Sequence, residues 1–349
     1  MMKLNTMRTR LDGLVIFRGI LQANIVPAFR AMLAAAGSED FVSAAADFEN
    51  QLLQDENICI RKAASGGAGQ AAARCMDSEL EFLQQLSRVT LVDLTGGEES
   101  LAFLPRWETE EVDFAAAYAE RLAEVGQKGY GMFARHHMFT IEDGSLIPVR
   151  FPDPQRLSEL PGYEHEREKV IANTKALLSG KPAVNVLLYG DAGTGKSSSV
   201  KAIANEFAAD GLRLVEVKKN QLYQIPALLD SLAQNPLKFI LFIDDLSFSA
   251  NDDNFAALKA ILEGSVGGRS QNVVVYATSN RRHLIKETLS DRSGDDIHEA
   301  DTRQELMSLS ARFGLTVTFQ RPDKVRFEEI LLDLAKQYEA AVLGRNRAA

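Results

Sequence analysis

The stretch GDAGTGKS, residues 190–197, decides the fold of this chain because it fits the pattern G-x-x-x-x-G-K-[ST]. The residues before it, Val186 to Tyr189, form a short apolar run that is typical of a strand. Ser198 to Ala208 follow with the pattern of a helix. A strand, a glycine-rich loop and a helix in this order are the context that a phosphate-binding loop requires.

The loop supplies the first candidate binding residues. Its glycines let successive N–H groups turn towards phosphate oxygens, and the N-terminus of the next helix adds a partial positive charge. We expect Lys196 to contact the β- and γ-phosphates and the Ser197 hydroxyl to bind Mg²⁺. A glycine-rich turn that matches by chance is the alternative, which the flanking strand and helix disfavour. The predicted nucleotide-binding residues are Gly190, Asp191, Ala192, Gly193, Thr194, Gly195, Lys196, Ser197 and Ser198.

The length suggests two domains, or one larger domain with an appendage, and the composition is typical of a soluble globular protein. The chain has 349 residues, of which 46% are hydrophobic and 25% charged. Its net charge of −9 disfavours a broadly basic surface for nucleic acid. Cys59 and Cys75 are the only cysteines, and no apolar run has the length of a membrane span. These features predict a cytoplasmic protein without a signal peptide or membrane contact.

Residues 1–130 are predicted to form a mostly helical N-terminal domain. Apolar residues recur at three- and four-residue spacing between Leu11 and Leu53, and Phe114 to Val125 continues the helical pattern. The small residues from Ala63 to Ala72 indicate a loop or linker. We find no catalytic constellation in this region.

Residues 131–161 are predicted to form a hairpin and a proline-rich linker. Asp143-Gly144 is a strong turn signal between two apolar runs. His136 and His137 precede the hairpin and could be metal ligands. No second pair at metal spacing lies nearby, so a structural role is the favoured interpretation.

Residues 162–320 alternate strands with helices, which predicts a five-stranded parallel sheet with helices on both faces. The apolar run Lys238 to Ile243 is typical of a strand buried on both faces, and it ends in Asp244 and Asp245. Carboxylates at this end of a strand lie where ligands bind in open parallel sheets. We expect Asp244 to hold Mg²⁺ and Asp245 to orient or deprotonate a water molecule. Two solvated aspartates in a turn are the alternative.

The last strands carry further candidate residues. Asn280 follows the apolar run Asn272 to Thr278 and can bind the attacking water or the γ-phosphate, although asparagine after a strand is also common turn chemistry. The charged segment from Arg281 to Arg303 is predicted to be a solvated loop. Arg312 precedes the last predicted strand, Thr316 to Phe319.

These motifs, in this order and spacing, resemble those of AAA+ ATPases. The surrounding segments Gly162–Glu164, Asn185–Gly190, Asp244–Phe248 and Thr278–Ile285 resemble the bacterial AAA+ family catalogued as domain of unknown function 815, from about Gly129 to Ile330. The resemblance implies Walker A residues at Lys196 and Ser197 and Walker B residues at Asp244 and Asp245. It also implies Asn280 as sensor 1 and Arg312 as an arginine finger in a homo-oligomer. In P-loop ATPases the residues just upstream of the first core strand often flank the adenine, so Tyr163 is a candidate contact to the base.

The chain departs from the usual AAA+ pattern at three places. Asp245 stands where most AAA+ proteins have a glutamate, so the side chain is one methylene shorter. Ala311 stands where an acidic residue often precedes the finger arginine. Residues 321–349 are expected to form one helix, Lys324 to Leu343, of a lid that is otherwise largely absent, and a second sensor arginine is not identified.

The resemblance implies an ATPase that uses ATP and Mg²⁺ to remodel or assemble a macromolecular partner, most simply a protein. Three alternatives stay open. The chain could be a nucleotide-dependent switch with little turnover. It could be a replication-type loader or initiator acting on nucleic acid, although no added basic or helix-turn-helix element is evident. A small-molecule P-loop kinase is the least favoured, because Asn280 and Arg312 would have no clear place in it.

Overall fold

The computed structural model of the chain describes residues 9–18, 55–63, 67–88, 113–248, 254–263, 271–280 and 309–348. The chain divides into two compact units, Met1–Arg135 and His136–Ala349. Most of the helical pattern predicted between Leu11 and Leu53, and the predicted charged loop from Arg281 to Arg303, lie outside the described residues.

The described part of the first unit is helical. Its core packs Phe82 and Leu83 against Phe114 and Tyr118, and all four side chains are buried. A helix begins at Gln70, inside the segment for which we predicted a loop or linker, because alanines favour helix once a core is available. The helices are α4 (Ile58–Ala63), α5 (Gln70–Ser87), α7 (Phe114–Ala123), α8 (Val125–Lys128) and α9 (Met132–Arg135).

The second unit is built on one seven-stranded sheet with the order β2-β1-β4-β5-β6-β3-β7. All neighbouring strands are parallel except β1 and β2. The strands are β1 (Met138–Glu142), β2 (Ser145–Pro148), β3 (Val186–Gly190), β4 (Leu212–Glu216), β5 (Lys238–Ile243), β6 (Val273–Ser279) and β7 (Leu315–Phe319). The predicted fold class is therefore confirmed.

The sheet has two more strands than the predicted five because the hairpin joins it. β1 pairs in parallel with β4, with Met138 opposite Leu214. Met138 and Phe139 are both buried, so β1 has apolar neighbours on both faces and extends the sheet. Next to it, His137 Nε2 lies 2.9 Å from Asn205 Oδ1. This histidine contacts another side chain of the same unit, and its structural role stays a prediction.

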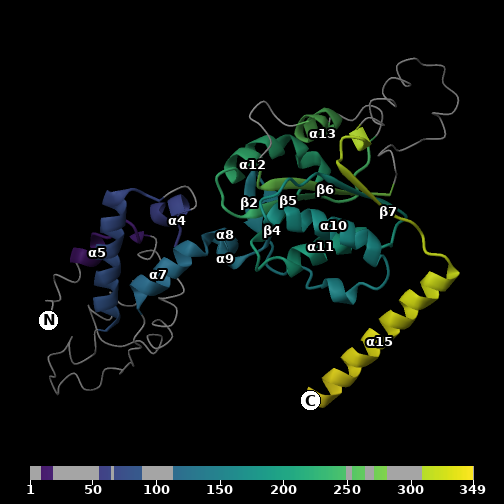
Figure 1. Cartoon of the computed structure of the whole chain (residues 1–349), viewed down its shortest axis with the longest axis horizontal. Coiled ribbons are helices and arrows are strands. Elements are labelled where there is room, and N and C mark those ends of the chain that lie inside the picture. The colour runs from purple at the N-terminus through teal and green to yellow at the C-terminus, as the bar shows by residue number, and fades with distance from the viewer. Residues whose placement is uncertain are drawn as a thin grey trace. The chain divides into compact units, whose positions relative to one another are not determined.

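Helices cover both faces of the sheet (Figure 1). Val170 and Leu177 of α10 (Glu164–Leu178) and Val200 of α11 (Lys196–Glu206) share one core with the strands. The other face carries α12 (Ile225–Leu232) and α13 (Asn254–Glu263). The 3₁₀-helix η4 (Lys219–Gln224) packs against both of these helices. The short 3₁₀-helix η3 (Leu157–Glu159) precedes α10.

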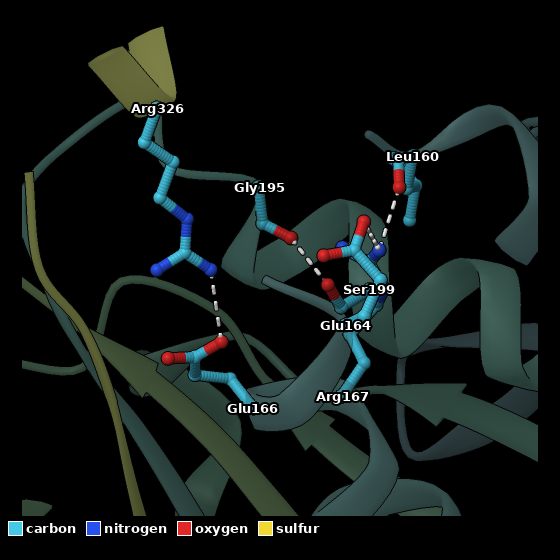
Figure 2. A network of polar contacts seen from close by, with 7 residues as sticks. All are labelled: Leu160, Glu164, Glu166, Arg167, Gly195, Ser199 and Arg326. Atoms are coloured by element: carbon cyan, nitrogen blue, oxygen red, sulfur yellow. Dashed lines mark hydrogen bonds and ion pairs between the residues drawn. The ribbon is translucent and has the colours of Figure 1, made fainter. Parts of the chain in front are cut away.

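The chain after β7 forms one helix, α15 (Lys324–Ala348), which runs past the predicted end at Leu343. Its first turns contact α10: Arg326 Nη2 lies 3.3 Å from Glu166 Oε2 (Figure 2). Ile330 lies so close to Gly162 that a Cβ on that glycine would be 2.8 Å from Ile330 Cδ1. Beyond these contacts the described side chains of α15 from Leu331 to Tyr338 are exposed.

Candidate nucleotide-binding site

The strand order brings the predicted site residues to one edge of the sheet. β6 lies between β3 and β5, and all three strands run in the same direction. The loop after β3, Asn280 after β6 and Asp244 after β5 therefore meet at the carboxyl ends of adjacent strands. This convergence is a consequence of topology and is independent of any bound molecule.

Gly190 lets β3 enter the loop beside the end of β7. Its φ is 143°, and a Cβ at this position would lie 1.9 Å from the carbonyl oxygen of Phe319. That same oxygen accepts a hydrogen bond from the Asp191 N–H at 3.2 Å, and the Asp191 carboxylate accepts one from the Arg321 N–H at 2.9 Å. Phe319 and Arg321 thus fix the start of the loop.

Replacing Gly190 by alanine should lower the free energy of unfolding by about 3 kcal/mol, because the added Cβ meets backbone and φ stays unfavourable. Gly180→Ala is the matched control, since Gly180 also has a positive φ, 67°, but nothing lies within 4 Å of its added Cβ. We expect about 1 kcal/mol there from backbone strain alone. Denaturant unfolding measures the free energy of unfolding of both variants. An equal decrease in the two would contradict the contact between the added Cβ and the Phe319 backbone as the cause.

Lys196 begins α11 and points back across the loop. Its Nζ donates to the Gly190 carbonyl at 2.8 Å, to the Asp191 carbonyl at 2.6 Å and to Asn280 Oδ1 at 3.0 Å. Burial lowers the pKa of this ammonium, while the carboxylates of Asp191, Asp244 and Asp245 partly oppose that shift. All three hydrogen bonds of Lys196 Nζ are thus made within the loop and to Asn280.

Two side-chain hydrogen bonds stabilise the loop and the first turn of α11. Ser199 Oγ donates to the Gly195 carbonyl at 2.8 Å, one turn back along the helix (Figure 2). Thr194 Oγ1 donates to the Asp191 carbonyl at 2.8 Å and spans the loop. These hydrogen bonds stabilise the conformation of the loop without a bound ligand.

Ser197 and Asp244 are in direct contact. Ser197 Oγ donates to Asp244 Oδ1 at 2.6 Å, across the gap between α11 and the end of β5. A hydroxyl and a carboxylate oxygen at one point suit Mg²⁺, which takes one or two protein oxygens and completes its shell with water and phosphate. The residues present therefore fit the ion. Within the described residues, no group of three or more His, Cys, Asp and Glu side chains could hold a metal.

Asp245 and Asn280 also meet. Asn280 Nδ2 donates to Asp245 Oδ1 at 3.0 Å, while the other side of the amide accepts from Lys196. Asp245 has a left-handed backbone with φ of 49°, which turns its exposed carboxylate out of line with the strand. The backbone thus turns at Asp245, directly after Asp244.

Thr278 is a site residue to which our sequence reasoning gave no role. Its hydroxyl donates to Asp244 Oδ1 at 2.5 Å and accepts from the Asp245 N–H at 2.9 Å. The side chain is only 1% exposed. Its position two residues before Asn280 could have indicated a role in the site. A threonine in a strand, however, is usually a β-branched packing residue.

Tyr163, the predicted base contact, is covered by other side chains. Its ring stacks on Phe319 with centroids 5.3 Å apart, and the Arg326 guanidinium lies 4.6 Å from the ring centroid. Its hydroxyl donates to the Gln320 carbonyl at 2.6 Å. These contacts join α10, β7 and α15 beside the loop, and the contact with a base stays a prediction.

Arg312 lies away from the other predicted site residues. It sits in the turn before β7, and Leu315 at the start of that strand pairs with Val186 at the start of β3. The loop leaves the opposite end, where Gly190 pairs with Phe319, about 13 Å further along at 3.3 Å per residue. Arg312 is therefore at the far edge of the sheet from its own chain's loop.

Comparisons with known proteins identify relatives. Residues 133–348 match the family described as "Protein of unknown function (DUF815)". The Replication factor C large subunit of Thermofilum pendens is 29% identical over 119 residues, which cover 32% of this chain and 28% of that protein. This chain therefore spans less than a third of that curated relative's length.

Solved structures give weaker likenesses. The Thermotoga maritima RuvB Holliday junction branch migration motor is 19% identical, with a TM-score of 0.33 over 53% of this chain and 54% of that chain. A DnaI crystal structure is 17% identical, with a TM-score of 0.36 over 54% of this chain and 97% of that chain. In the parts of the chain that the structure describes, no helix is long and apolar enough to cross a membrane.

Proposed function

We propose that this chain, which belongs to the DUF815 family and has the AAA+ P-loop fold, binds ATP with Mg²⁺ and hydrolyses it. The observation that carries the proposal is the convergence of one cation, two carboxylates and one amide on the loop after β3. Lys196, Asp244, Asp245 and Asn280 are linked by hydrogen bonds that include Ser197. A phosphate-binding loop with an acid pair and a polar amide is suited to transfer of a phosphoryl group to water.

In this proposal each residue of the site has a defined role. The loop N–H groups bind the phosphates, and Lys196 gives up its carbonyl contacts to neutralise charge on the β- and γ-phosphates. Ser197 and Asp244 hold Mg²⁺, which polarises the phosphoryl oxygens when bound. Asn280 and Asp245 orient the attacking water, and Asp245 accepts its proton as the bond from the γ-phosphorus to the leaving oxygen breaks. The products are ADP and phosphate.

We further propose that Arg312 acts on the nucleotide of a neighbouring copy of the chain. Its place at the far edge of the sheet supports this, because it cannot complete the site of its own chain without a large rearrangement. An arginine supplied in this way is worth about 10³ to 10⁵ in rate in GTPases. We propose that assembly and turnover are coupled, and that the energy is applied to a macromolecular partner.

ATP hydrolysis should therefore rise more steeply than protein concentration. The measurement is turnover across a concentration series, with the mass of the particles followed by light scattering with and without Mg-ATP. An inactive Lys196→Ala chain that supplies Arg312 should rescue Arg312→Ala turnover in mixtures. Equal specific activity at all concentrations, with no rescue, would contradict action between subunits.

A nucleotide switch with little turnover is the second candidate function. Lys196 already donates to two loop carbonyls and to Asn280, so the chain alone holds the site in an ordered arrangement. Tight ATP binding without turnover in an assembled sample would favour the switch over the ATPase.

A further inference from the structure

Thr278 sits at the centre of the acid pair. It lies on β6, between the strand that carries the loop and the strand that ends in Asp244. Its hydroxyl is both donor and acceptor: it donates to Asp244 and accepts from the backbone of Asp245. Its carbonyl also accepts from the Leu246 N–H at 2.7 Å. One residue thus contacts three consecutive residues after β5.

The contact with Asp244 orients that carboxylate. Oδ1 accepts from the Thr278 hydroxyl at 2.5 Å, from the Ser197 hydroxyl at 2.6 Å and from the Asp245 N–H at 3.1 Å. No described residue donates a hydrogen bond to Oδ2. Three donors on one oxygen fix the rotation of the carboxylate, so its second oxygen keeps its lone pairs for the ion or its water.

The contact with Asp245 holds an unfavourable backbone conformation. A left-handed residue that is not glycine costs about 1 kcal/mol or more, and such geometry persists where surrounding bonds fix it. The Asp245 N–H is shared between Thr278 Oγ1 and Asp244 Oδ1, and the Leu246 N–H is bound just beyond. These bonds aim the Asp245 carboxylate at Asn280.

We propose that Thr278 is a positioning residue that orients both acids through one hydroxyl, by donating to Asp244 and accepting from the Asp245 backbone. The proposal rests on the proposed function, since it concerns Mg²⁺ binding and hydrolysis at the same site. A hydroxyl can donate and accept at once, which a methyl group in the same place cannot do. Valine keeps the shape and loses both bonds, whereas serine keeps both bonds and loses a methyl group.

The test compares Thr278→Val with Thr278→Ser and with Thr174→Val. Thr174 is a matched control: its side chain is fully buried, and its hydroxyl donates to the Val170 carbonyl and bonds Tyr276, within the core of the same unit. Each full-length protein is titrated with a fluorescent ATP analogue in EDTA, and then with Mg²⁺ at fixed analogue. Turnover is measured on the same samples, and thermal unfolding reports the stability of each variant.

We expect Thr278→Val to bind the analogue in EDTA within about twofold of the wild type. Its Mg²⁺ midpoint should rise about tenfold, because removing a partner behind a metal ligand typically costs 10- to 100-fold in metal affinity or activity. Its kcat should fall about 10²-fold with little change in KM. Thr278→Ser should recover most of both losses, and Thr174→Val should show neither.

An unchanged Mg²⁺ midpoint in Thr278→Val would overturn the proposal, and so would a serine variant as impaired as valine. An equal loss in Thr174→Val would show a general effect of a lost buried hydroxyl, which also overturns it. A wild-type chain that binds Mg-ATP without turnover contradicts the proposed hydrolysis, while the Mg²⁺ titration still decides the role of Thr278.

Discussion

Lys196→Ala should abolish useful ATP binding, with an affinity about 100-fold lower than that of the wild type. Hydrogen bonds to charged groups contribute about 1.5 to 3 kcal/mol each, and the loss of two such bonds to phosphate at the low end gives about 3 kcal/mol, or roughly 100-fold. Lys196 now donates to two loop carbonyls and to Asn280. The same donors can turn to phosphate oxygens without a change in the helix that carries them.

Lys201→Ala is the control for this experiment. Lys201 lies on the same helix, and its ammonium is 3.9 Å from the Glu216 carboxylate, a partly exposed pair whose loss should change stability by less than about 1 kcal/mol. Isothermal titration with ATP and Mg²⁺ measures both variants, and circular dichroism confirms that they fold. Binding by Lys196→Ala within threefold of the wild type would contradict the role given to this lysine.

The sequence predicts the position of those site residues that directly follow a strand. The loop residues, Asp244 and Asn280 each follow an apolar run, and the carboxyl ends of parallel strands lie along the same edge of a sheet. The adjacency of β3, β6 and β5 then brings these particular residues into contact. The meeting of Lys196 with Asn280 and of Ser197 with Asp244 agrees with that expectation.

Contacts that depend on lateral order and rotamer could not be predicted. The Asp143-Gly144 turn predicts a hairpin, but it does not predict that β1 pairs with β4. The contacts of Tyr163 with Phe319 and Arg326 join residues more than 150 positions apart in the sequence. The two bonds of Thr278 depend on its register with the end of β5, which no local pattern encodes.

Asp245→Asn should keep ATP binding and lose turnover by at least about 100-fold, since a positioned general base contributes about 10² to 10⁴. Asparagine has the same shape, tolerates the left-handed backbone at φ of 49°, and its oxygen can still accept from Asn280. The change therefore removes the charge and the basicity and leaves the geometry in place. Single-turnover hydrolysis and nucleotide affinity, measured on the same protein, separate the two effects.

Asp143→Asn is a matched control for that variant, because Asp143 is also left-handed, with φ of 47°, and lies in the turn between β1 and β2. The same substitution in the same backbone conformation should leave turnover unchanged. If Asp245→Asn hydrolyses ATP at the wild-type rate, the proton goes to another acceptor and Asp245 only shapes the turn. If it loses binding instead, the acid acts on the bound nucleotide or its Mg²⁺ and not on the water. Loss of turnover with retained binding is the one result that assigns the water-activating role to this shorter acid, and it would explain why the chain bends its backbone to present it.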